Sequence, residues 1–147
     1  MLGTQYKTMP VITNSKDLKE RAGKLKNEKF IAVDTEFLRE KTYYPKLCLL
    51  QIAGEKDTFA VDPLADDMDM DPIYKLFSNK KILKVFHASQ QDLEIIFQKS
   101  GKIPTPLFDT QVAAQVLGYG EAVSYAKLVS DICGIELDKS SRYTDCQ

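Results

Sequence analysis

The sequence has no tryptophan, one histidine and only three cysteines. Cys48, Cys133 and Cys146 are odd in number and form neither a Cys-x-x-Cys pair nor a zinc-binding spacing, which favours reduced thiols over a disulfide framework. No apolar run is long enough to cross a bilayer, and the first residues lack the charged-then-apolar pattern of a signal peptide. These absences predict a soluble, cytoplasmic protein.

The chain also lacks a strong excess of charge of either sign. Its 20 Lys and Arg residues nearly balance 21 Asp and Glu residues, so the formal net charge is −1. Total charge therefore gives no general argument for binding nucleic acid, although local charge matters more than the sum. The segment 16–46 is richer in basic residues, whereas the segment 66–71 is acidic.

Hydrophobic patterning predicts one α/β domain over residues 1–147, built on a mixed sheet flanked by helices. The expected order is β-α-β-β-β-α-β-α-β-α-α, and short turns between the second, third and fourth strands indicate an antiparallel meander. We find no internal repeat and no interdomain linker. The predicted strands cover residues 9–13, 30–37, 47–53, 58–61, 81–87 and 107–108. The predicted helices cover about 15–27, 73–78, 90–99, 110–117 and 124–133.

Two carboxylates end the second predicted strand. Asp34 and Glu36 are separated by one residue, so their side chains should point to the same face of the strand. Two neighbouring like charges repel, and a divalent cation would relieve that repulsion; hard oxygen ligands suit Mg²⁺ or Mn²⁺. The alternative is a pair of solvated acids at a strand end.

A third acid, Asp92, lies where the fifth predicted strand gives way to a helix. Asp92 follows Ser89 by three residues, which matches a capping box at the start of that helix. Asp92 could instead face the same cleft as Asp34 and Glu36, and the two interpretations are compatible. His87 is either a packed structural residue or a base, and Asp109 could be no more than a helix cap.

Six segments of the chain together resemble ribonuclease D, in the DEDD superfamily of 3′–5′ exonucleases. The likeness runs from about Tyr6 to Asp145 and keeps the family's order and spacing, which makes the combination specific although each motif alone is weak. The matching segments are Val33-Asp-Thr-Glu-Phe37, Tyr43-Tyr-Pro-Lys-Leu-Cys-Leu-Leu-Gln-Ile-Ala53, Val61-Asp-Pro-Leu64, Phe86-His-Ala-Ser-Gln-Gln-Asp-Leu-Glu94, Phe108-Asp-Thr-Gln111 and Leu137-Asp-Lys-Ser140.

The resemblance implies a ribonuclease H-like fold and hydrolysis of RNA from a free 3′ end, with precursors of tRNA as the foremost family substrates. It implies two ions, Mg²⁺ or Mn²⁺, held by catalytic Asp34, Glu36 and Asp92. Asp34 would bridge both ions, Glu36 would also approach the terminal 3′-OH, and Asp92 would serve the second ion. Substrate contacts are expected from four residues, of which Tyr43 could also be ordinary structure. The four are Phe37, Tyr43, Gln51 and His87.

The sequence departs from the family at its end. The family supplies a fourth carboxylate in a Tyr-x-x-x-Asp motif, but the residues four after Tyr119, Tyr125 and Tyr143 are not acidic. The C-terminal helical RNA-binding domain of the family is also missing from this sequence. We expect a nuclease domain cut short, either as a fragment or as a natural short product, with severely impaired activity. The close likeness up to the last residues favours a fragment.

Two other functions remain open at this stage. The chain could be a 3′–5′ exonuclease acting on DNA, or a noncatalytic module that binds nucleic acid. The natural RNA and the oligomeric state cannot be read from these motifs.

Overall fold

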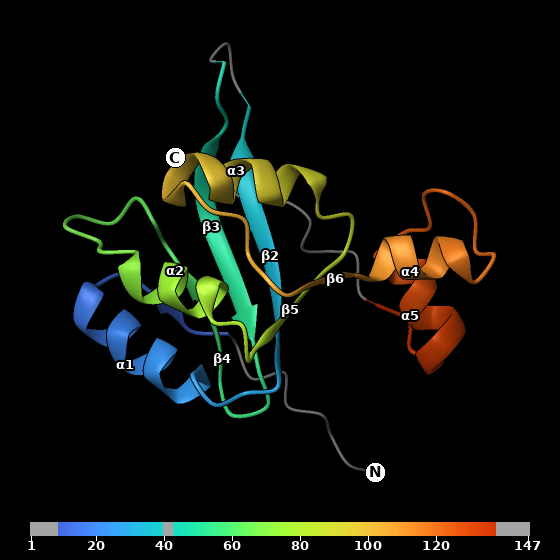
Figure 1. Cartoon of the computed structure of the whole chain (residues 1–147), viewed down its shortest axis with the longest axis horizontal. Coiled ribbons are helices and arrows are strands. Elements are labelled where there is room, and N and C mark those ends of the chain that lie inside the picture. Colours follow the sequence, from blue (N-terminus) through green and yellow to red (C-terminus); the bar gives the residue numbers. More distant parts are fainter. Residues whose placement is uncertain (1–8, 40–42, 138–147) are drawn as a thin grey trace.

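The computed structural model describes residues 9–39 and 43–137, and this part of the chain forms a mixed sheet with helices on it (Figure 1). The elements follow the predicted order, and the sheet order is β1-β4-β3-β2-β5-β6. The strands are β1 (Val11–Ile12), β2 (Phe30–Leu38), β3 (Lys46–Ala53), β4 (Thr58–Val61), β5 (Leu83–Phe86) and β6 (Leu107–Asp109). The helices are α1 (Ser15–Leu25), α2 (Asp71–Ser78), α3 (Gln90–Ser100), α4 (Thr110–Val116) and α5 (Tyr125–Cys133).

The middle of the sheet is the predicted antiparallel meander. β2 pairs with β3 and β3 with β4 in antiparallel fashion, whereas β1–β4, β2–β5 and β5–β6 are parallel pairs. The predicted α/β class with a mixed sheet is therefore confirmed. No helix in the described residues is long and apolar enough to cross a membrane.

One face of the sheet carries the main core. Ile31 and Val33 of β2 are buried, whereas the residues that alternate with them are exposed, because successive side chains of a strand point to opposite faces. Amphipathic helices α1 and α2 cover this face with buried residues spaced three or four apart. Those residues are Leu18, Ala22, Leu25, Ile73, Leu76 and Phe77.

Lys84 is a charged residue placed inside this core, on β5, with no exposed surface. Its ammonium donates hydrogen bonds to the carbonyl oxygens of Asn79 and Ile82 at 2.7 and 2.6 Å. A third bond of 2.7 Å reaches the carbonyl oxygen of Thr105. Burial lowers the pKa of Lys84 to about 8. Three donors meet three acceptors, so Lys84 joins β5 to the loops that precede β5 and β6.

Helices α4 and α5 form a separate unit beyond β6. Their small core consists of Ala114, Val123 and Leu128, and Figure 1 shows the pair set apart from α1, α2 and α3. Asp109 caps α4 with its side chain, as the sequence predicts. Ser124 caps α5, and Gly134 ends α5 with a positive φ of 66°.

Two details of the predicted elements were wrong. The helix predicted over residues 73–78 begins two residues earlier, at Asp71, and its cap is Met70. β1 is only two residues long, since its pairing with β4 covers Val11 and Ile12 alone.

Candidate active site

Asp34 and Glu36 lie on the face of β2 opposite to the main core. The buried residues Val33 and Thr35 alternate with them, so the two carboxylates share a face, as expected from their spacing. Asp34 is exposed and Glu36 is half-buried. The strand thus presents two acids on an open surface while its alternate residues anchor it in the core.

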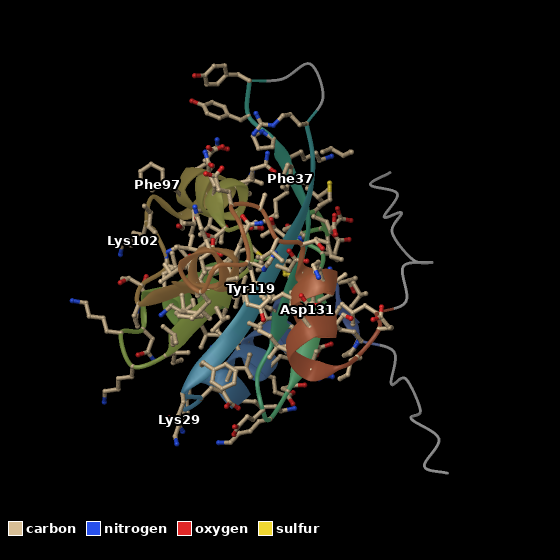
Figure 2. The ribbon with its side chains drawn as sticks, turned by 90° about the vertical axis from the view of Figure 1, so that its right-hand side faces the viewer. Lys29, Phe37, Phe97, Lys102, Tyr119 and Asp131 are labelled. Carbon is tan, nitrogen blue, oxygen red and sulfur yellow. The ribbon has the colours of Figure 1, made fainter. Side chains whose placement is uncertain are left out.

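The neighbouring strand β3 places Gln51 beside these acids. Gln51 is paired with Asp34 in the antiparallel register, and paired residues project to the same face. The register shifts after Glu36, so Phe37 pairs with Leu47 and β3 carries one extra residue there. Figure 2 shows Phe37 toward the hairpin end of β2, and its side chain is half-buried. Gln51 therefore lies beside the acids on β3, and Phe37 directly follows Glu36 on β2.

Asp92 reaches β2 because β2 extends beyond its parallel partner. The pairing of β2 with β5 ends at Ala32, and α3 begins shortly after β5. The Thr35 hydroxyl donates a 2.5 Å hydrogen bond to Oδ1 of Asp92 across 57 positions of sequence. Both residues are buried, with Thr35 6% and Asp92 7% exposed. This bond ties the start of α3 to the strand that carries the other two acids.

The three carboxylates are electrostatically linked. Desolvation raises the pKa of Asp34. A hydrogen bond from the backbone N–H of Thr35 and the charge of His87 both lower it, but by less. Desolvation and the charge of Asp34 raise the pKa of Glu36. Desolvation and the charge of Asp34 likewise raise the pKa of Asp92, opposed by the Thr35 hydroxyl. Each acid is thus harder to ionise than usual, with Asp34 acting on both others.

The donor chemistry of these acids fits a hard divalent cation. Carboxylate oxygens are the ligands of Mg²⁺ and Mn²⁺. A cation would offset the charge of Asp34, which, after desolvation, raises the pKa values of Glu36 and Asp92. Within residues 9–39 and 43–137, however, no three His, Cys, Asp or Glu side chains are already arranged to hold a metal ion. Asp34, Glu36 and Asp92 supply suitable ligands that still have to converge.

His87 is held by both of its ring nitrogens. Nδ1 lies 2.8 Å from the Thr110 hydroxyl, and Nε2 donates to the carbonyl oxygen of Val123 at 3.0 Å. The Tyr125 ring stands edge-on to the imidazole at 5.6 Å between centroids. His87 therefore joins the end of β5 to the α4–α5 unit, near enough to Asp34 to lower its pKa. Its contact with substrate stays a prediction.

Asp109 does more than cap α4. Besides the backbone N–H groups of Gln111 and Val112, its carboxylate accepts hydrogen bonds from those of Ala88 and Ser89 at 3.1 and 2.8 Å. Although partial burial raises its pKa, the hydrogen bonds from Ser89, Gln111 and Ala88 lower it overall. Asp109 thereby fixes the turn, with Ala88 at φ 57°, that leads into α3 and Asp92.

The capping box expected at Ser89 is absent. Ser89 has helical backbone angles, φ −67° and ψ −10°, and its side chain makes no capping hydrogen bond. Asp109 binds the Ser89 N–H from another strand instead. The position of Asp109 directly after a short predicted strand could have revealed this contact. Parallel strands β5 and β6 end at the same edge of the sheet, where Phe86 pairs with Asp109.

We expect Asp109→Ala to destabilise the protein by about 2 kcal/mol at pH 7, since a helix cap and two loop hydrogen bonds are lost. The pKa of Asp109 is lowered by folding, so its contribution is present above the ordinary carboxyl pKa and lost as pH falls through the lower, folded value. Urea unfolding at pH 7 and at progressively lower pH measures this. Asp131→Ala, which removes an exposed pair with Lys127, should cost at most about 0.5 kcal/mol. Equal effects of both variants would contradict the assignment.

The remaining predicted residues lie away from the three acids or outside the described residues. Tyr43 lies in the loop between β2 and β3, with 88% of its surface exposed. It lines a groove with residues of α3 rather than the surface around Asp34 and Gln51. Tyr143 and most of the Leu137-Asp-Lys-Ser140 segment lie outside the described residues.

Comparison with known proteins identifies the family. The 3′–5′ exonuclease family matches residues 9–147. Ribonuclease D of Bartonella henselae is 47% identical over 137 residues, which cover 93% of this chain and 34% of that protein. Ribonuclease D of Zymomonas mobilis is 53% identical over 137 residues, covering 92% and 35%. The chain thus spans about a third of the length of the curated relatives it matches.

A solved structure shares the fold. The crystal structure of Escherichia coli RNase D, described as an exoribonuclease involved in structured RNA processing, superposes with a TM-score of 0.87 and 34% identity. The match covers 93% of this chain and 36% of that one. The expected ribonuclease H-like fold and the likeness to ribonuclease D are thereby confirmed, and the chain belongs to the 3′–5′ exonuclease family.

Proposed function

We propose that this chain is the exonuclease domain of a ribonuclease D-type enzyme, which removes nucleotides one at a time from the 3′ end of RNA. The observation that carries the proposal is the linkage of three acids from two elements: Asp34 and Glu36 on one face of β2, and Asp92 bound to that strand through Thr35. Desolvation raises all three pKa values, and the charge of Asp34 raises those of Glu36 and Asp92 further, a combination typical of reaction sites.

Asp34, Glu36 and Asp92 would hold Mg²⁺ or Mn²⁺. When bound, such ions polarise phosphoryl oxygens and make water a stronger nucleophile. The overall reaction adds water across the terminal phosphodiester: the water oxygen bonds to phosphorus, the bond from phosphorus to the upstream O3′ breaks, and that oxygen takes a proton. The product is a nucleoside 5′-monophosphate. A fourth carboxylate for the site would come from beyond the residues that this sequence contains.

Residues around the acids suit a terminal nucleotide. Gln51 lies next to Asp34 with both a donor and an acceptor on its amide, which can hydrogen-bond a ribose hydroxyl or a base edge. Phe37 presents a half-buried ring after the bulge, suitable for packing against a base. His87 supports this surface by fixing the end of β5. RNA is favoured over DNA because relatives that are 47% and 53% identical to this chain are ribonucleases by name. The substrates we expect are tRNA precursors.

The test is stepwise shortening of a single-stranded RNA of 12 nucleotides, labelled at its 5′ end, with Mg²⁺ or Mn²⁺. We expect a ladder that forms slowly, in line with the impairment expected from the sequence. Asp34→Ala should abolish this ladder, whereas Asp66→Ala, which removes an exposed acid of the same type on another loop, should leave it intact. A DNA of the same sequence should be shortened more slowly. A ladder that persists in Asp34→Ala would refute the assignment of the site.

Failure to shorten RNA has two distinguishable causes. If RNA still binds and a version extended with the segment that follows in the relatives shortens it, the fourth ligand lies outside residues 1–147, in line with the impairment expected from the sequence. If the extended version also binds without shortening, the noncatalytic alternative is correct.

A further inference from the structure

A second surface, which we call the hairpin groove, lies between the β2–β3 hairpin and helix α3. It has a volume of about 1040 Å³. The hairpin side contributes Arg39, Tyr43 and Tyr44, and α3 contributes Glu94, Phe97 and Lys99. None of the catalytic acids lines it. The groove therefore needs an explanation of its own.

Exposed aromatic rings characterise the groove. Tyr43 is 88% exposed and Phe97 52% exposed, one on each wall. The Tyr43 ring meets the Tyr44 ring edge-on, with centroids 4.9 Å apart and planes at 90°, so the pair presents rings in two orientations. Large apolar rings gathered on a surface mark an interaction site. Flat rings on both walls suit the stacking of nucleobases, which tolerates any sequence.

Positive charge accompanies the rings. Arg39 and Lys99 line opposite walls, and Glu94 is the one acid among the described residues of the lining. Arg39 lies 3.7 Å from Glu94, but both side chains are about half exposed, so this pair is weak and can exchange for a phosphate. Two cations next to stacking rings favour a nucleic-acid strand over an apolar peptide.

Both walls of the groove lie close along the chain to the proposed catalytic acids. Arg39 follows Glu36 by three residues, roughly 10 Å along an extended chain. On the other wall, Phe97 follows Asp92 by five residues, roughly 7.5 Å along α3. A strand whose 3′ end lies at the acids would reach the groove within a few nucleotides.

From these observations we infer that the hairpin groove binds the single-stranded RNA segment upstream of the nucleotide being removed. Bases stack on Tyr43 and Phe97, while Arg39 and Lys99 contact phosphates. This inference rests on the proposed exonuclease function, because it takes the 3′ end of the same strand to lie at Asp34 and Glu36. It gives the domain a preference for single-stranded 3′ ends several nucleotides long.

The test compares RNA length with groove substitutions. Fluorescence anisotropy measures binding of 5′-labelled oligouridylates of 2 and 12 nucleotides, with Ca²⁺ replacing Mg²⁺ to slow hydrolysis. Phe97→Ala should weaken binding of the 12-mer about 10-fold and binding of the 2-mer less than about 2-fold. Lys99→Ala should reduce the slope of log affinity against log salt for the 12-mer by about 0.7.

Matched controls lie at the other end of β2. Phe30→Ala removes a ring that is 45% exposed, and Lys29→Ala removes an exposed lysine that Figure 2 shows far from Phe37. Both should leave the 12-mer affinity within about 2-fold of the unsubstituted protein. All four side chains are exposed enough for truncation to leave the fold intact, which circular dichroism checks.

The outcomes separate this inference from the proposed function. If RNA is shortened in an Asp34-dependent way but Phe97→Ala and Lys99→Ala bind the 12-mer normally, the groove inference is wrong and the exonuclease proposal stands. Equal weakening for the 2-mer and the 12-mer would also overturn the inference. If the groove variants lose 12-mer binding while no extended version shortens RNA, the groove binds RNA and the exonuclease proposal fails.

Discussion

Replacing Asp34 with asparagine should raise the melting temperature of the metal-free protein by about 1–2 °C, because solvent screens an exposed charge, while lowering RNA hydrolysis at least about 100-fold. The gain in stability arises because partial desolvation disfavours the charge of Asp34, although much of its side chain is exposed, and because that charge raises the pKa values of both Glu36 and Asp92. Asparagine keeps the shape and removes that charge. Activity falls because a carboxylate ligand shared by the site is lost, and a loss of about 3 kcal/mol of transition-state stabilisation corresponds to 100-fold in rate.

The stabilising effect should depend on pH in a defined direction. Folding raises the pKa of Asp34, so its contribution to stability is fully present below the ordinary carboxyl pKa and is lost as pH rises through the raised value. Near pH 7 the native protein carries this penalty and the Asn variant does not. The difference in melting temperature should therefore be largest near pH 7 and shrink towards pH 4.

Thermal unfolding with and without MgCl₂ tests both halves of the prediction. Added Mg²⁺ should stabilise the native protein more than Asp34→Asn, since a cation that binds only the folded state raises stability by mass action. Asp66→Asn provides the control for removing one negative charge from an exposed loop. A lower melting temperature of metal-free Asp34→Asn at pH 7 would show that the three acids do not repel one another as described.

The part of this site that lies on a single strand was predictable from the sequence. Asp34 and Glu36 sit one residue apart in an alternating strand, and period-two geometry alone places them on one face. Helix caps such as Asn14, Ser124 and Asp109 can be predicted for the same reason, because a capping side chain accepts a hydrogen bond from a backbone N–H only two or three residues away.

Long-range contacts were not predictable in the same way. The hydrogen bond between Thr35 and Asp92 spans 57 positions of sequence. It forms because β2 extends beyond the end of its pairing with β5, and no local sequence pattern encodes that difference. The sequence gives no sign that Lys84 is buried, since it is a polar residue within a strand. In the structure its side chain lies in the core, where its ammonium group donates hydrogen bonds to carbonyl oxygens of two loops. The expected capping box at Ser89 was wrong for the same reason, since the partner that binds Ser89 comes from β6.

Thr35→Val should separate the positioning of Asp92 from its chemistry. Valine has nearly the shape of threonine but cannot donate to Oδ1 of Asp92, so a buried carboxylate loses a hydrogen-bond partner. We expect a loss of about 1–3 kcal/mol in unfolding free energy at pH 7. Affinity for Mg²⁺ should fall about 10- to 100-fold, as for other groups that orient a metal ligand.

The pH dependence distinguishes this role from simple packing. The Thr35 hydroxyl lowers the pKa of Asp92, against desolvation that raises it, so its removal moves that pKa further up. The acid limb of the rate profile for RNA shortening should therefore shift to higher pH in Thr35→Val. Its destabilisation should be smaller at low pH, where Asp92 is protonated in both proteins. Thr35→Ser, which keeps the hydroxyl, should restore the original acid limb and most of the Mg²⁺ affinity.

Mg²⁺ affinity can be read without turnover, from the rise in melting temperature with MgCl₂ concentration. This matters because the chain spans only about a third of its relatives' length, and the full reaction requires ligands beyond Asp34, Glu36 and Asp92 on our proposal. A Thr35→Val protein with unchanged Mg²⁺ affinity and an unchanged acid limb would mean that the hydrogen bond only packs α3 against β2. A fall in Mg²⁺ affinity together with a shifted acid limb, both reversed in Thr35→Ser, would establish that the Thr35 hydroxyl positions Asp92 and tunes its pKa.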